Sequence, residues 1–426
     1  MRIASSKISP TIVEELPNNA TLVRQHMGDR KTVSVAFAVK VGSAYEEDSN
    51  SGISHFVEHT VFKGTKSRNT FDIKEPIERV GGTLNAYTGR VATVFFAQMP
   101  VTHIDEAMEI LFDLVLNPSF DKQAIELEKQ VILEEISEAE DDPLDYIYDM
   151  TIKKIWDKNF GRPVLGTRET VSRFTRDQIF NFHNQMYSSD KMIFAITGNY
   201  SDEVICKIKR MLSFLPNTSG DNSYVTGSIK AKPVYFSETR KDLKQTHILL
   251  SKPGPGRTTE DDFEAFRVFN VFFGSGMSSI LFHNIREKQG MVYNIHSEYV
   301  AYKDFGSFFI NASTNPRNVD KLLESIRREM QRLKSDGVKN NELNYGKERL
   351  KGKLMMSTES TLATMSRHID EMITMGYPSS IEDILEKIDS LTVKKVSDVI
   401  NNHLSGKWNI SILSSKNNGS NISFEL

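Results

Sequence analysis

The stretch LPNTSGDNSYVTGSIKAKP, residues 215–233, divides the 426-residue chain near its midpoint. It is rich in Ser, Gly, Asn and Pro, the composition of a connecting segment rather than of a helix or strand. A chain of this length exceeds one compact core and suits two domains of roughly 200 residues each. We therefore predict an N-terminal domain over 1–215, a linker over 216–233 and a C-terminal domain over 234–426.

Patterned stretches before this division predict strands and helices. The predicted strands are TIVEEL (11–16), ATLVRQHM (20–27), TVSVAFAVKVG (32–42), GGTLNAYTGR (81–90), VATVFFAQMP (91–100) and MIFAITGNYS (192–201). The predicted helices include SHFVEHTVFKG (54–64), THIDEAMEILFDLVLN (102–117) and DKQAIELEKQVILEEISEAE (121–140). TVSVAFAVKVG is apolar almost throughout, which is typical of a strand covered on both faces.

The same order of elements begins again after residue 233. A strand at THILLSK (246–252) precedes a helix at DDFEAFRVFNVFF (261–273), strands around 291–302 and 306–314, two further helices, and a last strand at WNISILSS (408–415). A repeat of this kind predicts an α+β fold with two similar domains, each a mainly antiparallel β-sheet packed with α-helices.

HFVEH at 55–59 places two histidines and a glutamate on one predicted helix. Because residues i and i+4 share a helix face, His55 and His59 can present two imidazole nitrogens to one ion, with Glu58 beside them. His-x-x-Glu-His is the inverted form of the commoner zinc-protease motif, in which the glutamate is a base and not a ligand. The motif predicts His55 and His59 as metal ligands and Glu58 as the base that takes a proton from water.

A helix that carries two histidines incidentally gives the same pattern, and a catalytic zinc needs a third protein ligand. The acidic stretch ELEKQVILEEISEAEDDP (126–143) offers several glutamates. Glu135 is the candidate ligand, although spacing alone does not choose it over Glu134 or Glu138. Glu128 lies two turns earlier on the same face, where it can accept the other ring N–H of a ligating histidine.

The repeat indicates that the scaffold does not need these residues. Aligning Gly64 with Gly274, an offset of 210 residues, places AFRVF (265–269) over HFVEH (55–59). The second half therefore has apolar residues where the first has ligating ones. We predict one reactive centre per chain, in the N-terminal half.

Composition restricts the function further. A net charge of −3, 39% hydrophobic and 26% charged residues are typical of a soluble globular protein, and argue against binding nucleic acid through overall charge. Cys206 is the only cysteine, so any metal must be held by His, Asp or Glu. No secretory signal and no 18-residue apolar stretch occurs, so we expect a cytoplasmic protein without a membrane span, unless a targeting segment preceded residue 1.

HFVEHTVFKGT at 55–65, followed by Glu135 in EKQVILEE, resembles the pitrilysin (insulinase) family of zinc metallopeptidases, most closely its mitochondrial processing peptidase-like branch. The resemblance covers nearly the whole chain. Further similar stretches are GGTLNAYTGR (81–90), EDDPLDYIYD (140–149), NFGRPVLGT (159–167) and FFGSGMSSILFHNIREKQGMVYNIHS (272–297). One departure is Val91, because the family usually has a glutamate after TGR.

The resemblance implies one Zn²⁺ per chain and a set of site residues. The implied ligands are His55, His59 and Glu135, with Glu58 as general base and Glu128 supporting a ligating histidine. It also implies that the strand containing Asn85 and Ala86 lies at the edge of its sheet and that a peptide is laid along it. Arg286 and Tyr293 would hold the substrate backbone or stabilise the oxyanion. Taken without the resemblance, ordinary roles are favoured for both residues: Tyr293 as a strand residue and Arg286 as part of a solvated helix end.

Asp145 and Asp149 form a further pair at i and i+4, in PLDYIYDM. They are either a solvated helix face near Lys153 and Lys154 or, as in processing peptidases, carboxylates that accept an arginine of the substrate. The second interpretation predicts a preference for basic, presequence-like peptides.

The resemblance also implies assembly. A two-domain chain corresponds to half of the four-domain family members, so two chains are expected to enclose a chamber, as a homodimer or as a heterodimer with an inactive homologue. Two other functions stay open: a non-catalytic structural subunit, and a protein that binds peptides along the same strand without cleaving them. The complete set of HFVEH with Glu135 argues against the non-catalytic subunit.

Overall fold

The computed structural model describes residues 9–216, 223–416 and 422–426, which form two compact units. Unit 1 takes the described residues within Met1–Ser137, Arg162–Val225 and Met356–Ser380. Unit 2 takes those within Glu138–Gly161, Thr226–Met355 and Ile381–Leu426. Part of the predicted linker, 217–222, lies outside the described residues. The described part of the linker, 223–233, contains no helix and only an isolated bridge from Ile229 to Trp156.

Unit 1 is built on a six-stranded sheet in the order β1-β2-β6-β3-β5-β4. Its strands are β1 (Ile12–Glu15), β2 (Thr21–His26), β3 (Thr32–Val39), β4 (Thr83–Thr88), β5 (Thr93–Pro100) and β6 (Met192–Gly198). Only β2 and β6 run parallel, and the other neighbours are antiparallel. β4 therefore lies at one edge of the sheet, where the resemblance had placed its strand.

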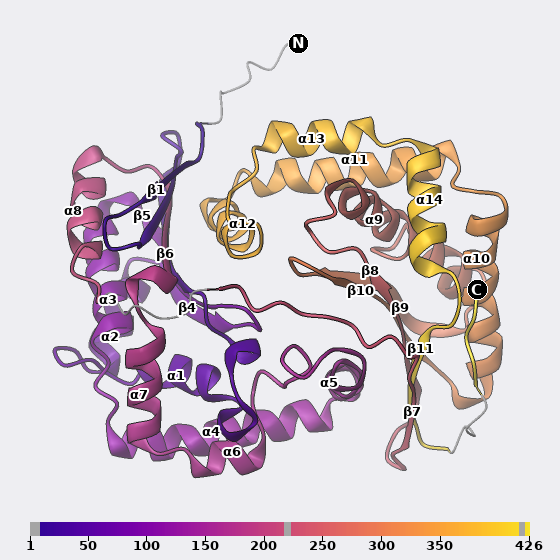
Figure 1. The fold of residues 1–426 in the computed structure, drawn as a ribbon, viewed down its shortest axis with the longest axis horizontal. Helices are drawn as coiled ribbons and strands as arrows, with labels where there is room; N and C mark the ends of the chain where they lie inside the picture. Colours follow the sequence, from indigo (N-terminus) through magenta and orange to yellow (C-terminus); the bar gives the residue numbers. More distant parts are fainter. Residues whose placement is uncertain (1–8, 217–222, 417–421) are drawn as a thin grey trace. The chain divides into compact units, whose positions relative to one another are not determined.

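Helices cover both faces of this sheet (Figure 1). The helices of unit 1 are α1 (Ile53–Val61), α2 (Thr70–Arg79), α3 (Ile104–Leu116), α6 (Arg168–Arg173), α7 (Arg176–Met186), α8 (Asp202–Leu212) and α12 (Thr361–Thr374), and α4 (Lys122–Asp141) continues from unit 1 into unit 2. α3 packs on one face of β3 and α12 on the other. The prediction of a strand covered on both faces is thus confirmed for 32–39, whereas residues 40–42 of the predicted strand lie beyond its end.

The side chains of β3 explain this double cover. Val33, Val35 and Phe37 point into the core shared with α3, whereas the small Ala36 and Ala38 point to the α12 face. Alternating side chains of a strand lie on opposite faces, so small residues on one face allow α12 to approach closely.

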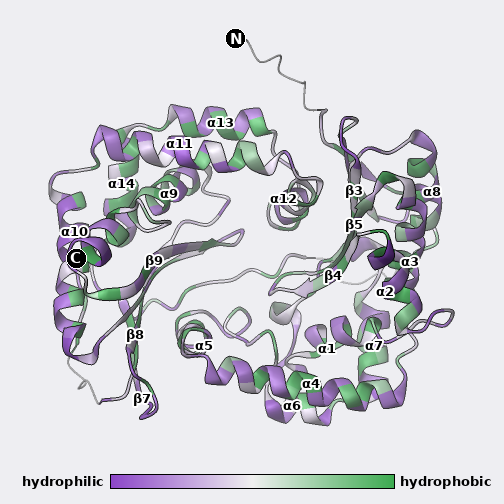
Figure 2. Ribbon diagram, turned by 180° about the vertical axis from the view of Figure 1, so that it is seen from behind, coloured by the Kyte–Doolittle hydropathy of each residue, from purple (hydrophilic) through white to green (hydrophobic). Residues whose placement is uncertain are grey.

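Unit 2 repeats the design with a five-stranded sheet in the order β7-β11-β8-β10-β9. Its strands are β7 (Tyr235–Thr239), β8 (Thr246–Gly254), β9 (Val292–Ala301), β10 (Gly306–Thr314) and β11 (Asn409–Ser414), and only β7 and β11 run parallel. Its helices are α5 (Pro143–Ile155), α9 (Glu260–Phe273), α10 (Val319–Ser335), α11 (Asn340–Ser357, whose last turn enters unit 1), α13 (Ile381–Ser390) and α14 (Val393–Leu404). Hydrophobic and hydrophilic residues alternate along these helices, as expected for helices that cover a sheet (Figure 2).

The two sheets confirm the predicted α+β repeat. In the first sheet β2 runs parallel to β6, and β3, β5 and β4 follow antiparallel. In the second sheet β7 runs parallel to β11, and β8, β10 and β9 follow antiparallel. One helix of each half is exchanged: α5 packs on β8 and β11 of unit 2, and α12 packs on β3 and β6 of unit 1. Each compact unit therefore contains segments from both halves of the chain. The predicted domain boundaries at 216–233 divide the chain in sequence order and stay a prediction.

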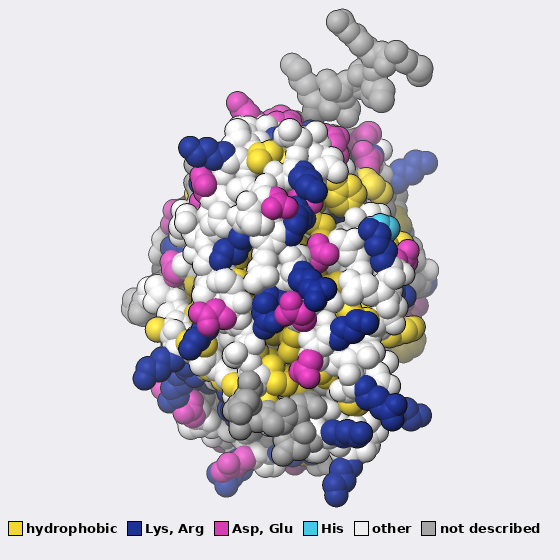
Figure 3. Space-filling model, turned by 90° about the vertical axis from the view of Figure 1, so that its right-hand side faces the viewer, with side chains coloured by type: hydrophobic (Ala, Val, Ile, Leu, Met, Phe, Trp, Pro, Cys, Tyr) yellow, Lys and Arg dark blue, Asp and Glu magenta, His cyan; other side chains and the backbone are white. Residues whose placement is uncertain are grey.

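The charged side chains on the surface reflect the nearly equal numbers of basic and acidic residues in the sequence. Figure 3 shows one face, on which lysines and arginines are interspersed with aspartates and glutamates. Within the described residues, we find no helix that combines the length and the apolar character needed to cross a bilayer.

Candidate metal centre

Helix α1 carries His55, Glu58 and His59, and a remote carboxylate anchors its first turn. The helix begins after Gly52, whose φ of +92° favours glycine, and a Cβ there would lie 2.6 Å from the Cα of Gly166. Gly52 has no side chain with which to cap the helix. The buried carboxylate of Glu46 accepts hydrogen bonds from the N–H groups of Gly52 (2.7 Å) and Ser54 (2.9 Å) instead.

His55, His59 and Glu135 come together between α1 and α4. Nε2 of His55 lies 3.7 Å and Nε2 of His59 lies 3.5 Å from Oε2 of Glu135. One donor atom from each residue lies within 4.8 Å of the others, and in the part of the chain that the structure describes this is the one such group. Atoms bound tetrahedrally to one zinc ion at about 2.0–2.2 Å lie about 3.3–3.6 Å apart. The distances from both histidines to Glu135 lie close to this range, so the three residues are spaced to bind one Zn²⁺ with small side-chain adjustments.

Glu128 holds His59 in the tautomer that a metal ligand requires. Its Oε2 lies 3.0 Å from Nδ1 of His59, which donates to it and leaves Nε2 facing Glu135. Oε1 of Glu128 pairs with Nζ of Lys63 at 2.6 Å. Burial opposes the charge of Glu128, but the hydrogen bonds from His59 and Lys63 outweigh it and hold its pKa below the usual range.

The pKa values of the two histidines shift in opposite directions. Burial, together with the neighbouring His59, lowers the pKa of His55 to about 3, so its imidazole is neutral. Burial also disfavours a charge on His59, but the hydrogen bond to Glu128 and the charges of Glu135 and Glu58 raise its pKa overall. The raised pKa favours the protonated form of His59, so a metal ion that binds here competes with a proton for that ring.

Glu58 faces the same space and is held by β4. The hydroxyl of Thr88 donates to Oε2 of Glu58 at 2.6 Å. Burial raises the pKa of Glu58 and the charge of Glu135 adds to it, against the hydrogen bond from Thr88 and the charge of His59. A carboxylate with a raised pKa is a better proton acceptor near neutral pH, as a general base requires.

The remaining predicted residues lie apart from this cluster in sequence. Asn85 and Ala86 are on edge strand β4, and Oδ1 of Asn85 accepts from the N–H of Ala86 at 2.8 Å. Asp145 and Asp149 lie on α5 of unit 2, and burial, with the charges of Asp142 and Glu138, raises the pKa of Asp145.

Arg286 and Tyr293 are neighbours within unit 2. The guanidinium of Arg286 lies 5.5 Å from the ring centroid of Tyr293 and 4.5 Å from that of Phe282. Tyr293 is 75% exposed, at the start of β9. The exposure leaves its hydroxyl accessible, and the roles predicted for both residues stay predictions.

Sequence reasoning missed three residues that hold the site: Glu46, Lys63 and Thr88. Lys63 could have been found, because it follows His59 by four residues and is a cation near the end of α1. Glu46 and Thr88 reach α1 through tertiary contacts, and nothing in their local sequence indicates either contact.

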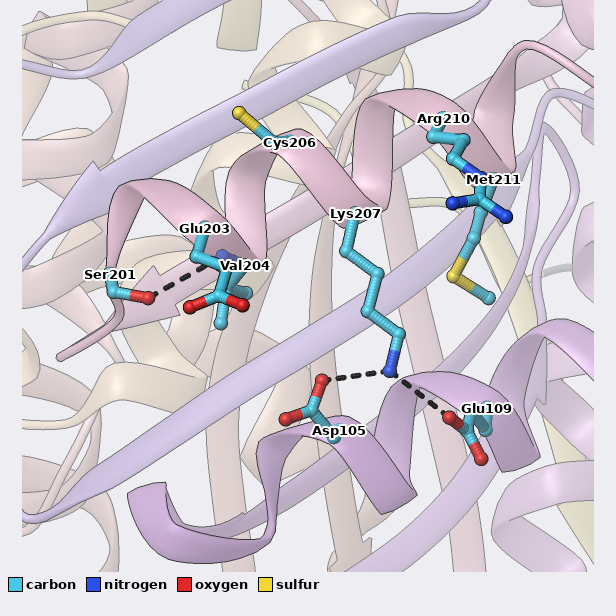
Figure 4. A pocket seen from close by; sticks show the side chains of 9 residues that line it. All are labelled: Asp105, Glu109, Ser201, Glu203, Val204, Cys206, Lys207, Arg210 and Met211. Atoms are coloured by element: carbon cyan, nitrogen blue, oxygen red, sulfur yellow. Dashed lines mark hydrogen bonds and ion pairs between the residues drawn. The ribbon is translucent and has the colours of Figure 1, made fainter.

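A hollow of about 660 Å³ lies between α3 and α8 (Figure 4). It contains none of the residues of the metal cluster. Lys207 points from α8 toward α3, where its Nζ donates to Asp105 (2.8 Å) and Glu109 (3.0 Å). The charge of Lys207 is thus balanced by two carboxylates. Among the described residues, the lining of the hollow has no group of metal-ligating side chains like that at α1.

Known proteins share both the sequence and the fold. Residues 22–168 match the family model "Insulinase (Peptidase family M16)", and 173–350 match "Peptidase M16 inactive domain". An uncharacterized zinc protease of Mycobacterium leprae is 32% identical over 93% of this chain and 90% of its own length. An uncharacterized zinc protease of Bacillus subtilis is 29% identical over 94% and 97%.

Solved structures agree on the architecture. A protease from Helicobacter pylori superposes with a TM-score of 0.88 at 20% identity, over 95% of this chain and 100% of that chain. The structure called peptidase M16 inactive domain from Pseudomonas fluorescens gives 0.86 at 18% identity, over 96% and 98%.

The fold and the donor set define the class: a two-domain α+β protein with an inverted zinc motif in its first half only. Within that class, the chain belongs to the insulinase family of peptidases, family M16. The matching of the second half to an inactive domain agrees with the apolar AFRVF at 265–269.

Proposed function

We propose that the chain is a zinc-dependent endopeptidase that cleaves extended peptides. The observation that carries this proposal is the convergence of His55, His59 and Glu135 beside the hydrogen-bonded carboxylate of Glu58. Three protein ligands with an adjacent base are the arrangement of a catalytic zinc site, whereas structural sites have four protein ligands. The names of the relatives, zinc proteases, support the same chemistry.

The metal and the base have separate tasks in this mechanism. When bound, zinc polarises the scissile carbonyl and lowers the pKa of water from 15.7 to about 7. Glu58 accepts the proton of the attacking water and then passes it to the leaving amine, so its carboxylate is regenerated at the end of each cycle. In the neutral ring of His59, Glu128 holds the proton on Nδ1, which leaves the lone pair of Nε2 for the metal.

The substrate is proposed to lie along the free edge of β4, near Asn85 and Ala86. An edge strand offers unpaired backbone N–H and C=O groups to an extended peptide, and alternate side chains of the peptide then face opposite sides of the sheet. Arg286 and Tyr293 are proposed to donate to the substrate backbone or to the developing oxyanion.

The test of this function is Glu58→Gln. We expect hydrolysis of a peptide library, followed by mass spectrometry, to fall by about 10²–10⁴-fold while zinc content stays at one per chain, because glutamine cannot accept the proton. Glu134→Gln is the matched control, since exposed Glu134 precedes Glu135 but lies outside the donor set. Glu135→Gln should lose zinc.

Unchanged hydrolysis by zinc-loaded Glu58→Gln would contradict the mechanism. A wild-type protein that holds zinc and binds peptides but cleaves none would favour the peptide-binding or structural alternative. The same library reports the preference for basic peptides proposed for Asp145 and Asp149. Equal rates for arginine-containing peptides and their alanine counterparts would remove that preference.

Assembly and location stay proposals. The resemblance supports a homodimer, or a heterodimer with an inactive homologue, and full activity of a chain that light scattering shows to be monomeric would contradict both. The cytoplasmic location rests only on the absence of a recognisable targeting signal in the sequence, and fractionation of the producing cells tests it.

A further inference from the structure

Thr88 makes the contact that joins the peptide-binding strand to the proposed base. It is the last residue of β4, and its hydroxyl donates to Oε2 of Glu58 at 2.6 Å. Among the residues that the structure describes, none hydrogen-bonds to Oε1 of Glu58. We propose that Thr88 is a positioning residue that holds Oε2 and so presents Oε1 for proton transfer, an inference that rests on the peptidase function proposed above.

The position of Thr88 is fixed by the turn that follows it. The carbonyl groups of Gly89 and Arg90 accept hydrogen bonds from the N–H groups of Ser43 (3.2 Å) and Ala44 (2.9 Å). A Cβ on Gly42 would lie 2.2 Å from the carbonyl oxygen of Gly89, so the two backbones touch. The end of β4 therefore cannot shift without disturbing the segment 42–46.

The same segment fixes the helix that carries the base. Glu46, at its end, accepts from the first N–H groups of α1. Ser43 is held in turn by the buried Arg162, whose guanidinium donates to the carbonyl oxygen of Ser43 at 2.9 Å. Segment 42–46 thus braces both the end of β4 and the start of α1.

The contacts of segment 42–46 fix the geometry of the hydrogen bond between Thr88 and Glu58. The donor Thr88 and the acceptor Glu58 stand on two elements that one segment holds, so the backbone sets their separation. A glutamate side chain otherwise has several rotamers, and fixing one before reaction lowers the cost of reaching the reactive geometry. An ordinary alternative is that Thr88 only satisfies a half-buried carboxylate, which would affect stability and not the catalytic step.

Two substitutions separate these roles in the zinc-loaded protein. Thr88→Val removes the hydroxyl and keeps the shape, and we expect it to lower kcat about tenfold on a fluorogenic peptide, with KM within about twofold of wild type and zinc content unchanged. Thr88→Ser keeps the hydroxyl and should recover kcat to within about threefold. Thr374→Val is the matched control, because this buried threonine of unit 1 donates to the carbonyl oxygen of Asp370, also at 2.6 Å.

A double-mutant cycle identifies the target of Thr88. In a Glu58→Gln background there is no carboxylate to position, so Thr88→Val should cause no further loss. A second tenfold loss in that background, a loss confined to KM, or failure of Thr88→Ser to recover activity would each overturn the proposal.

A crystal structure of zinc-loaded Thr88→Val gives a readout independent of activity. We expect the Glu58 carboxylate to leave its wild-type orientation, and an unchanged orientation would overturn the proposal. If wild-type protein binds zinc but hydrolyses no peptide, the peptidase function fails, and this structure still decides whether Thr88 positions Glu58.

Discussion

Burial and neighbouring side chains both influence the pKa values of the ionisable residues His55 and Glu128. Burial keeps His55 neutral, whereas the pKa of Glu128, which is also buried, is lowered because His59 and Lys63 both donate to it. A buried carboxylate without such partners would become protonated and could no longer orient a histidine.

His183 shows the same influence of burial outside the site. It lies on α7, its Nε2 is 2.8 Å from the carbonyl oxygen of Val115, and its ring stacks on Tyr187. Burial lowers the pKa of His183 to about 4, although the hydrogen bond to Val115 opposes this effect. The folded protein therefore disfavours the protonated ring.

We predict that His183 makes the folded state sensitive to mild acid. Because its folded pKa lies below the unfolded value of 6.5, the stability that it contributes is complete above pH 6.5 and is lost as the pH falls toward 4. The difference in free energy of unfolding between wild type and His183→Gln should narrow by about 1.4 kcal/mol per pH unit in this window. Urea unfolding at several pH values measures it, and parallel curves would refute the prediction.

At the scale of elements, the exchanged helices α5 and α12 are the main departure from two separate halves. α12 places Met365, Ile369 and Met372 against the small residues of β3 and β6, and its Thr361 hydroxyl lies 2.9 Å from that of Ser34. The first sheet thus depends on residues that follow it by more than 150 positions in sequence.

A core substitution on α12 should therefore weaken unit 1. Ile369 is 1% exposed, and we expect Ile369→Ala to lower the free energy of unfolding by about 2–5 kcal/mol, because truncation leaves a cavity against the sheet. Met356→Ala is the control, since Met356 is 77% exposed and its truncation should change stability by less than about 0.5 kcal/mol. Hydrogen exchange should accelerate in β3 and β6 for Ile369→Ala, and unchanged protection there would contradict the assignment of α12 to unit 1.

The whole molecule is a repeat in which the first copy has the three donor residues His55, His59 and Glu135. Both halves keep the strand order and the parallel pair, but α9 has AFRVF where α1 has HFVEH. The fold of each half forms whether or not the metal-ligating residues are present. The second half can therefore keep the fold without binding a metal.

The exchange of helices predicts how the chain divides on truncation. A fragment of residues 1–215 retains the first sheet but lacks α12, so the apolar face of Ala36, Ala38 and Ile193 would be exposed to water. We expect this fragment to show poorly dispersed amide NMR signals and no cooperative urea transition. Joining residues 356–380 to it should restore both. A fragment 1–215 that unfolds cooperatively at the midpoint of the full chain would contradict this prediction.

Local patterns in the chain were enough to identify most of the elements, the repeat and the metal motif. Helical spacing places His55, Glu58 and His59 on one face whatever packs around them, and strand and helix periods depend only on neighbouring residues. The resemblance added Glu135, which spacing had left undecided against Glu134 and Glu138. The α+β fold and the family followed from the same information.

Contacts between distant segments decided the rest. Thr88 and Glu46 act on α1 through the fold of segment 42–46 and the end of β4, and α12 joins a sheet formed by the other half of the chain. The periodic pattern of apolar residues does not predict these long-range contacts, because each depends on which segments meet when the chain folds. The metal motif could therefore be recognised in the sequence, whereas the hydrogen bond from Thr88 to Glu58 exists only in the folded protein.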